Sequence, residues 1–302
     1  MPHPSPTTTP LSSTRTSERT SDRSAGTDFV FPPDSMIWKI YRENFVLLGG
    51  PTAAILQIAH PLIGRGVAQH SNFVKDSQRR LEHTLHAIYT ITFGTKAQAR
   101  EVQRTVAKAH RPVKSAPGET PEYSAFDSDL MLWVIATLAR TSMFLYERWV
   151  APVPLPQKNT FYQDLRVFGT YFGLATTYGP QNWSDFLLYY EEMIQGPLLG
   201  SDPVCAEVAK HVHRPVSPFL FRLGTIPTRF LATELLPLPL ARRLKLRPAW
   251  LAPESMDLLD TLLPTSLPHL PPVLRFTPGY LQAQKKLLGT PTSPSALGFG
   301  HF

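Results

Sequence analysis

Histidine is concentrated in one part of the sequence. Five of the ten histidines lie in the 51 residues from His60 to His110, about three times the number that an even distribution along 302 residues would give. They are His60, His70, His83, His86 and His110. Residues 60–115 also contain ten Lys or Arg and three acids, a local charge of +7 that equals the net charge of the whole chain. Imidazole beside guanidinium suits a metal or proton-transfer centre next to an anionic group.

Two neighbouring helices would bring part of this set together. Apolar residues at helical spacing predict helices over 77–93 and 96–111, joined by a turn at Gly94. If these helices are antiparallel, positions equidistant from the turn face each other, and His110 lies opposite Arg80. An inward arginine needs an anion, and the carboxylate of a bound cofactor would supply one.

The faces of the two helices are consistent with this arrangement. Arg80, His83 and Thr84 are spaced i, i+3 and i+4, so their side chains share one face of the first helix. The less charged stripe of the second helix consists of Ala99, Val102 or Gln103, Val106 and His110. A basic stripe on the same helix consists of Arg100, Arg104, Lys108 and Arg111. We therefore expect His110 to face inward, either as a metal ligand or as a core histidine bonded to a carbonyl.

The other histidines of this window carry weaker signals. His60 and His70 follow helical turns rich in small residues, and each either acts in catalysis or caps a helix. His86 points about 60° away from His83, because three residues advance a helix by about 300°. We expect His86 to be structural or exposed.

Several other chemistries lack their motifs. Neither Glu82 nor Glu101 is followed by a histidine three residues later, which argues against a carboxylate-bridged di-iron bundle. The sequence contains no His-Glu-x-x-His zinc motif, no Gly-x-Ser-x-Gly nucleophile elbow and no Gly-Lys-Ser/Thr phosphate loop. The single cysteine, Cys205, excludes an internal disulfide and a zinc site with two thiolates. Aromatic residues do not interleave with the basic stripe, so we expect no nucleic-acid partner.

The elements that must position these residues are helical. From Met36 onward apolar residues recur at helical spacing without alternating strands or internal repeats, which predicts an all-α fold. The predicted helices cover residues 36–47, 51–60, 62–70, 77–93, 96–111, 128–149, 158–173, 183–194, 203–212, 227–235, 239–246, 254–262 and 275–287. The segment Asp127–Val150 begins with an Asp-Ser-Asp cap and is then apolar on every side, which predicts a central, buried helix.

The chain divides into three parts. Residues 1–28 are rich in Ser, Thr and Pro and predict a disordered tail, residues 29–290 predict a single helical domain, and residues 291–302 predict a flexible end. The tail lacks the pattern of a signal peptide. The one uncharged stretch of membrane-spanning length, Phe45–Gly64, contains internal Gly, Pro, Gln and His residues, which argues against a bilayer helix.

These features lead us to expect an intracellular protein that is cytoplasmic or bound at the periphery of a membrane. The Leu- and Pro-rich segment Phe230–Leu246 carries basic residues at its end, and such a segment would suit an anionic bilayer. The oligomeric state does not follow from the sequence.

A set of short segments, taken in order, resembles a known family. The segments are Gly49-Gly50-Pro51, Leu56–Pro61, Gly66–Phe73, Arg80-x-x-x-Thr84, Thr92-Phe93-Gly94, Val106-x-x-x-His110, Leu132–Leu138, Tyr146-Glu147-Arg148 and Leu235-Leu236-Pro237. From about Trp38 to Trp250 the sequence is similar to the haem-containing oxygenases that include latex clearing protein (rubber oxygenase) and the ER-bound oxygenase of mycophenolic acid biosynthesis.

The resemblance implies an all-α fold in the style of the globins that holds one haem b. His110 matches the ligand of the haem iron, and Arg80 and Thr84 match haem-site residues of the family. His83 stands where the rubber-cleaving branch has a lysine beside the iron, so it either ligates the iron or hydrogen-bonds to oxygen. Arg80, His83 and Thr84 are therefore the candidate catalytic residues, and Arg80, Thr84 and His110 the candidate cofactor-binding residues.

The resemblance also implies a reaction, in which dioxygen is inserted into an alkene of an isoprenoid or other lipophilic chain and the chain is cleaved to carbonyl products. Apolar walls for such a substrate would come from Leu85, Ile88, Trp133, Thr137 and Phe144. Two positions depart from the family pattern, since Ile135 replaces a common histidine and Thr52 a common arginine. The rival interpretation is a non-catalytic haem- or lipid-binding helical protein, and Ile135 is its main support.

Overall fold

The computed structural model describes residues 28–70, 77–212, 231–232, 234–246 and 254–289, and it gives the backbone alone for Ser77, Gln78, Arg80, Glu254 and Ser255. Every regular element in these ranges is a helix, and isolated bridges are the β-type pairings described there. The all-α prediction is therefore confirmed for the described part of the chain. The tail predicted at 1–28, apart from Asp28, and the flexible end predicted at 291–302 lie outside these ranges.

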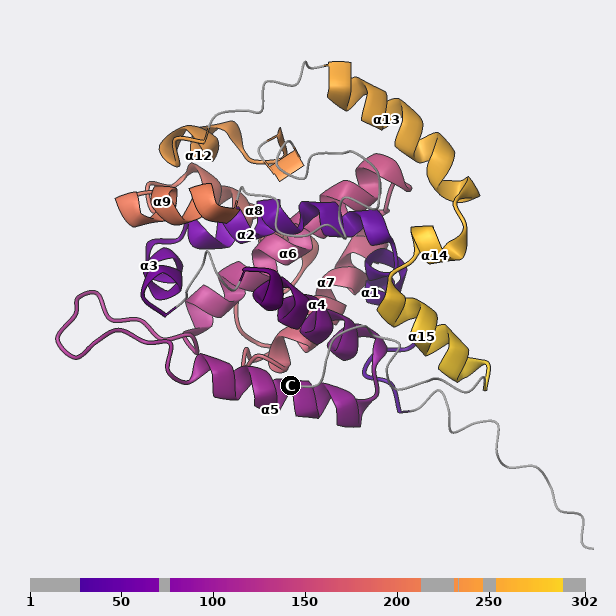
Figure 1. Cartoon of the computed structure of the whole chain (residues 1–302), viewed down its shortest axis with the longest axis horizontal. Coiled ribbons are helices and arrows are strands. Elements are labelled where there is room, and N and C mark those ends of the chain that lie inside the picture. The colour runs from indigo at the N-terminus through magenta and orange to yellow at the C-terminus, as the bar shows by residue number, and fades with distance from the viewer. Residues whose placement is uncertain (1–27, 71–76, 213–230, 233, 247–253, 290–302) are drawn as a thin grey trace, which may run out of the picture.

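The helices follow one another in the order labelled in Figure 1. The first half of the chain contains α1 (Met36–Tyr41), η1 (Asn44–Gly49), α2 (Gly50–Ile58), α3 (Pro61–His70), α4 (Ser77–Phe93), α5 (Lys96–His110) and α6 (Ser128–Trp149). The second half contains α7 (Leu155–Thr170), α8 (Trp183–Gln195), α9 (Pro203–Val212), α12 (Leu238–Arg243), α13 (Glu254–Ser266), η2 (Leu267–His269), α14 (Pro272–Arg275) and α15 (Pro278–Leu287). The elements η1 and η2 are 3₁₀ helices.

Helix α6 forms the centre of the fold, as its sequence predicts. Its first turn is capped by Asp127, whose carboxylate accepts hydrogen bonds from the backbone N–H groups of Asp129 (2.9 Å) and Leu130 (3.2 Å). Buried side chains occur on all sides of the helix, and it packs against α1, η1, α2, α7 and α13. The fully buried Trp133 donates its indole N–H to the carbonyl of Leu56 in α2 at 2.9 Å, which fixes these two helices to each other.

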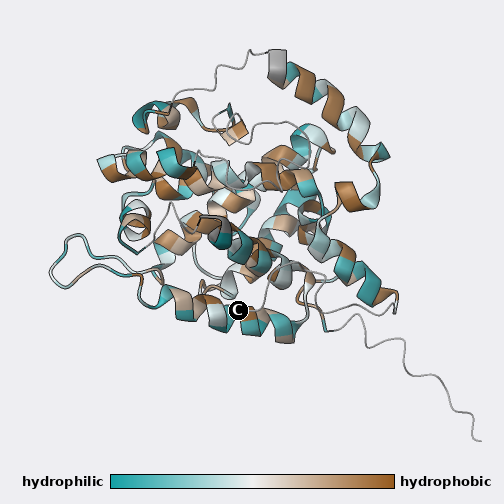
Figure 2. Ribbon diagram, in the orientation of Figure 1, coloured by the Kyte–Doolittle hydropathy of each residue, from teal (hydrophilic) through white to brown (hydrophobic). Residues whose placement is uncertain are grey.

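By length and composition α6 is apolar enough to cross a membrane, and so is the bent pair Asn44–Ile58 and Pro61–His70, whose two parts meet at 102°. In α6, 61% of the apolar window is buried inside the protein. The described contacts of α6 are therefore those of a core helix. Helix α5 at the lower edge of the molecule differs from α6, since it carries both hydrophilic and hydrophobic residues (Figure 2).

Most predicted helices are confirmed with small shifts at their ends, but two are divided. The helix predicted at 36–47 breaks at Glu43, and the helix predicted at 275–287 breaks at Phe276 and Thr277. The helix predicted at 227–235 lies mostly outside the described residues.

The two breaks meet at a buried ion pair between distant segments, and the second also falls at Thr277, the N-cap residue before Pro278. The Glu43 side chain is fully buried, and its carboxylate accepts hydrogen bonds from Arg275 at 2.9 and 3.1 Å. A buried carboxylate is unfavourable unless it is paired, so the two segments must approach closely. They do so through an isolated bridge between Glu43 and Phe276 and a backbone hydrogen bond from Thr277 to Arg42 (2.7 Å), which helical residues could not form.

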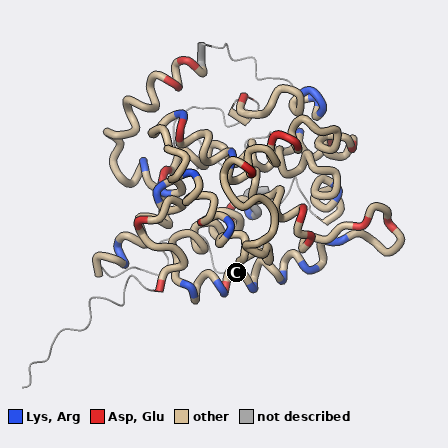
Figure 3. Tube along the Cα trace, turned by 180° about the vertical axis from the view of Figure 1, so that it is seen from behind, with Lys and Arg blue, Asp and Glu red and all other residues tan. Residues whose placement is uncertain are grey.

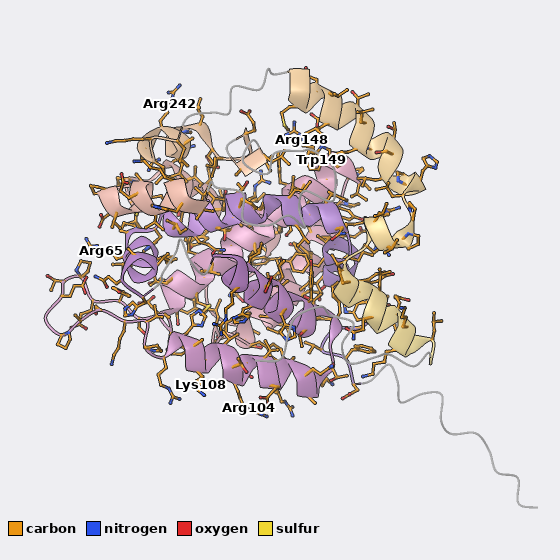
Figure 4. The ribbon with its side chains drawn as sticks, viewed as in Figure 1. Arg65, Arg104, Lys108, Arg148, Trp149 and Arg242 are labelled. Atoms are coloured by element: carbon orange, nitrogen blue, oxygen red, sulfur yellow. The ribbon has the colours of Figure 1, made fainter. Side chains whose placement is uncertain are left out.

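Helix α13 is attached to the far end of α6 by a carboxylate and by the packing of Met256, Leu259 and Leu263 against the core. Asp260 accepts hydrogen bonds from the Arg148 guanidinium at two 2.7 Å contacts and from the Trp149 indole at 2.9 Å. Figure 4 shows Arg148 and Trp149 together at this end of α6, below α13. The predicted helix at 254–262 continues to Ser266, past Pro264.

The start of α1 is capped from another helix rather than from its own sequence. Its N-cap residue, Ser35, makes no side-chain cap, and the carboxylate of Asp164 in α7 instead accepts a hydrogen bond from the Ile37 N–H at 3.0 Å. Burial raises the pKa of Asp164 to about 6, and hydrogen bonds from the Ile37 and Met36 N–H groups lower it by less. The charged form of this carboxylate is therefore disfavoured in the folded protein.

This shift predicts a pH-dependent stability that the substitution Asp164→Asn removes. The folded-state pKa lies above the ordinary value of 3.8, so the contribution of Asp164 to stability is largest below pH 3.8 and is lost as the pH rises through about 6. From pH 4.5 to pH 8 we expect D164N to gain roughly 2 kcal/mol of unfolding free energy relative to wild type. Urea denaturation at both pH values measures this gain, and a difference that stays constant with pH would contradict it.

Candidate functional site

Helices α4 and α5 pack against each other as an antiparallel pair, as predicted. The turn between them needs Gly94, because a Cβ atom there would lie 2.3 Å from the carbonyl oxygen of Thr90. Thr95 then starts α5 with a capping box, since its hydroxyl accepts from the Gln98 N–H at 3.3 Å and its own N–H donates to the Gln98 side chain at 2.9 Å.

The lengths of the two helices set their register. Because α4 ends at Phe93 and α5 begins at Lys96, residues equally far from the turn lie level with each other. On this count His83 of α4 is level with Val106 of α5, and Arg80 is level with Ala109, beside His110. The bounds of the two helices agree with the predicted ones, and the register follows from these bounds by counting.

The inner face of α5 follows the predicted stripe for most of its length. Ala99 and Val102 are buried, and Val106 is half-buried against the core. His110, at the end of the stripe, is exposed instead of facing inward as expected. His110 lies in the last turn of α5, at the end of the helix pair. The first turn of α4 is at the same end, and its Arg79 is exposed as well.

The imidazole of His110 is held in one orientation by its own helix. Its Nδ1 atom lies 2.8 Å from the carbonyl oxygen of Val106. A carbonyl oxygen only accepts hydrogen bonds, so Nδ1 must carry the hydrogen. In the neutral ring the lone pair then belongs to Nε2, the nitrogen that is turned away from the helix backbone. The ring therefore lies back over the turn of Val106 and offers Nε2 as a metal ligand.

On the register counted above, His83 and Thr84 of α4 lie level with the turn of α5 that contains Val106. His83 and Thr84 are exposed, and His86, one turn further on, is half-buried. Burial lowers the pKa of His86, and the nearby His83 lowers it further. The side chain of Arg80 lies outside the described residues, so its predicted position opposite His110 rests on the backbone register alone.

The five side chains predicted to form an apolar wall do not meet on one surface. Trp133 and Thr137 face α2, where the Thr137 hydroxyl accepts a hydrogen bond from Gln57 at 3.0 Å. Phe144 lies beneath the guanidinium groups of Arg140 and Arg148, at 5.3 and 5.7 Å from the ring centre. The remaining two, Leu85 and Ile88, are half-buried on α4, on the same helix as His83.

His60 and His70 take separate structural positions. His60 is buried where α2 meets α3, and its Nδ1 has no hydrogen-bond partner among the described residues. Burial lowers the pKa of His60, while the charges of Asp127 and Asp129 raise it by less. The exposed His70 joins α3 to the loop after α5, because its Nε2 lies 3.0 Å from the carbonyl oxygen of Lys114.

The two departures from the family pattern are both buried. Ile135 is 3% exposed and packs toward α7, where a Cβ atom on Gly169 would lie 3.8 Å from its Cγ1. Thr52 is buried in α2, and its hydroxyl has no hydrogen-bond partner among the described residues. An isoleucine at position 135 completes apolar packing where an imidazole would need a polar partner.

The donor groups restrict the kind of metal site that α4 and α5 could build. Within the described ranges no three His, Cys, Asp or Glu side chains gather closely enough to hold a metal ion. Cys205 is buried, as expected for a packed thiol. A single imidazole, by contrast, is sufficient for a metal whose other ligands come from a macrocycle.

Comparison with known proteins identifies relatives of the chain. Residues 38–265 match the family described as "ER-bound oxygenase mpaB/B'/Rubber oxygenase, catalytic domain". The uncharacterized proteins Mb2261 of Mycobacterium bovis and Rv2237 of Mycobacterium tuberculosis are each 29% identical to it over 146 residues. This alignment covers 47% of the chain and 57% of each relative, so the chain spans little more than half the length of these curated relatives. No solved structure matches it.

The geometry of His110 predicts the tautomer of its ring. Nitrogen NMR of protein with ¹⁵N-labelled histidine, at a pH of about 8 where an ordinary imidazole is neutral, should find the hydrogen of His110 on Nδ1. Two other histidines serve as controls. His211 should be the same tautomer, because its Nδ1 lies 2.9 Å from the Glu207 carbonyl oxygen, and His70 should be the opposite one. A hydrogen on Nε2 of His110 would contradict the assigned orientation.

Proposed function

The chain belongs to the catalytic-domain family of the ER-bound oxygenase mpaB/B' and rubber oxygenase, and on that premise we propose that it is a haem b-dependent oxygenase. The family supplies the oxygenase class. The proposal adds the cofactor, a lipophilic and isoprenoid-like substrate, and oxidative cleavage of a C=C bond.

The observation that carries the haem proposal is the hydrogen bond from His110 Nδ1 to the Val106 carbonyl oxygen at 2.8 Å. Such a bond fixes the ring and raises the basicity of the other nitrogen, as partners of metal-bound imidazoles commonly do. The exposed position of His110 supports the same role, because a ligand to a large flat cofactor must not be covered by other side chains. The residues present therefore fit a haem.

The remaining site residues take their roles from the register of α4 and α5. When bound, haem supplies a redox-active iron that activates dioxygen. We propose that His110 Nε2 would bind the iron, that His83 would bind it as well or hydrogen-bond to oxygen, that Thr84 would supply a hydroxyl contact, and that Arg80 would pair with a haem propionate. An arginine suits that role because its guanidinium pairs with carboxylates through two parallel hydrogen bonds.

The reaction balances without an external electron donor. Both atoms of dioxygen enter the alkene, the C=C bond breaks, and two carbonyl groups form. Of the apolar side chains expected to line a substrate site, Leu85 and Ile88 lie on the same helix as His83, where they pack against the core. Exclusion of water by such side chains keeps activated oxygen from being diverted.

A second candidate function is a haem- or lipid-binding protein without catalysis. It is favoured by Ile135, which is buried against α7 where many relatives are expected to have a histidine. The two candidates differ in one measurement, the consumption of oxygen by the haem-loaded protein in the presence of polyprenyl substrates. Uptake with formation of aldehydes or ketones supports the oxygenase, and its absence in a protein that binds haem supports the carrier.

We predict that His110→Ala lowers the affinity for haem by more than about 100-fold, since the loss of a partner to a metal ligand alone commonly costs 10- to 100-fold. Titration of the purified protein with haemin, followed by the Soret band, measures this loss. His86→Ala is the matched control, because His86 lies on the facing helix but outside the assigned ligand set. Free imidazole should restore the band in His110→Gly. A wild-type protein that stays colourless after haemin addition would refute the proposal.

We also predict that the ferric wild-type protein is low-spin, with histidine on both sides of the iron, and that His83→Ala is high-spin. The reason is the register, which sets His83 level with Val106 and hence with the ring of His110. Electron paramagnetic resonance of both proteins measures the spin state. A high-spin wild-type spectrum would assign His83 to hydrogen bonding instead of ligation.

A further inference from the structure

The outer face of α5 is a continuous basic surface. It consists of Arg100, Arg104, Lys108 and Arg111, all exposed. At 100° per residue these four positions fall within about 80° of the helix circumference, and at 1.5 Å per residue they extend over about 17 Å. Figure 4 shows Arg104 and Lys108 pointing away from the body of the protein, and Figure 3 shows the basic positions of α5 along its lower edge.

Three of these cations have no acidic partner. The one acid on α5, Glu101, forms an ion pair with Arg104, and both side chains are about two-thirds exposed. Arg100, Lys108 and Arg111 form no ion pair with any other described residue. The face therefore carries three positive charges without an ion pair among the described residues, and one that is paired with Glu101.

The excess of positive charge lies in the part of the sequence that contains this face. Residues 60–115 contribute ten basic and three acidic side chains, and the remaining residues contribute 20 of each, since 30 − 10 = 20 and 23 − 3 = 20. The net charge of +7 thus resides in the segment that contains α5. An anionic surface would attract the protein with this side first.

We propose that the outer face of α5 binds the surface of an anionic lipid bilayer. A bilayer is favoured because the face is straight, basic and without aromatic side chains, and electrostatic attachment to a flat anionic surface needs no more than this. Single-stranded nucleic acid would instead require aromatic side chains for base stacking.

The structure also distinguishes α5 from α12, the segment for which the sequence predicts membrane contact. In α12, Arg243 is directed into the protein, where its guanidinium donates to the carbonyl oxygens of Ile194, Gly196 and Leu199 at 2.7 to 2.9 Å. This leaves Arg242 in α12 and Lys245 just after it as the exposed cations in the described part of the segment. Arg242 lies at the edge of the molecule opposite to α5, so one flat bilayer cannot contact both (Figure 4).

Binding along α5 leaves the candidate haem site uncovered. His110 lies about 120° around the helix from the centre of the basic face, on the flank that turns toward α4. The bilayer would thus contact the helix that carries the iron ligand without blocking it. A lipophilic substrate could then pass from the bilayer to the site. This last step rests on the proposed function, whereas the binding of α5 to the bilayer does not.

Sedimentation with vesicles tests the proposal on the full chain. Wild-type protein should bind vesicles of phosphatidylcholine with 30% phosphatidylserine at low salt, release them as salt is raised, and ignore pure phosphatidylcholine. Each cation near the surface strengthens binding about fivefold, or about 1 kcal/mol. Arg100→Gln with Lys108→Gln should therefore weaken binding about 25-fold.

The matched control is Arg242→Gln with Lys245→Gln, which removes the same charge from α12 and should leave binding within about twofold of wild type. An equal loss in both double variants would attribute binding to net charge and overturn the proposal. So would a failure to bind anionic vesicles at low salt, or tighter binding of single-stranded DNA in the same buffer. His110→Ala should bind vesicles like wild type, which separates failure of this inference from failure of the haem proposal.

Discussion

The fold depends on one constraint, the burial of α6 on all sides. A helix that is apolar around its whole circumference cannot lie at a surface, so other helices must cover every side of it. Helices α1, α2, α7 and α13 and the 3₁₀ helix η1 do so. The bond from Trp133 to Leu56 fixes α2 in this arrangement, and Asp260 fixes α13. The residues that could do chemistry are thereby displaced to the outer pair, α4 and α5.

The outer pair performs two tasks with different faces of one helix. The inner stripe of α5, from Ala99 to Val106, attaches the pair to the core, and the tight turn at Gly94 with the Thr95 cap sets the register. At the end of that stripe the backbone itself orients an imidazole, because Nδ1 of His110 bonds to the carbonyl four residues earlier. On the proposal that His110 binds a metal, this backbone hydrogen bond orients the ring without a neighbouring carboxylate.

Features that depend on residues close together in the sequence could be predicted, whereas those that depend on residues far apart could not. Helices, the Asp127 cap and the phase of the α5 stripe are local, so they could be predicted from spacing. The break at Glu43 could not, because its partner Arg275 is 232 residues away. The burial of the helix that carries Trp133 and Thr137 is confirmed, but both face α2 rather than a substrate site as predicted, because periodicity does not reveal which neighbour a buried face meets. The bond of His110 to Val106 was predictable in principle, since it joins residues i and i−4.

The helices that form the hydrophobic core and the segment that carries the net charge are different parts of the chain. The central helices carry the hydrophobic core, while the net charge of +7 resides in residues 60–115, which include the outer pair. A protein whose charge is spread evenly meets an anionic surface in any orientation, but one with an excess of positive charge on one helix face meets it preferentially with that face. The basic face of α5 therefore favours the orientation in which this helix meets an anionic partner. On the proposed function, contact through this side would bring the candidate site close to a bilayer in which a lipophilic substrate resides.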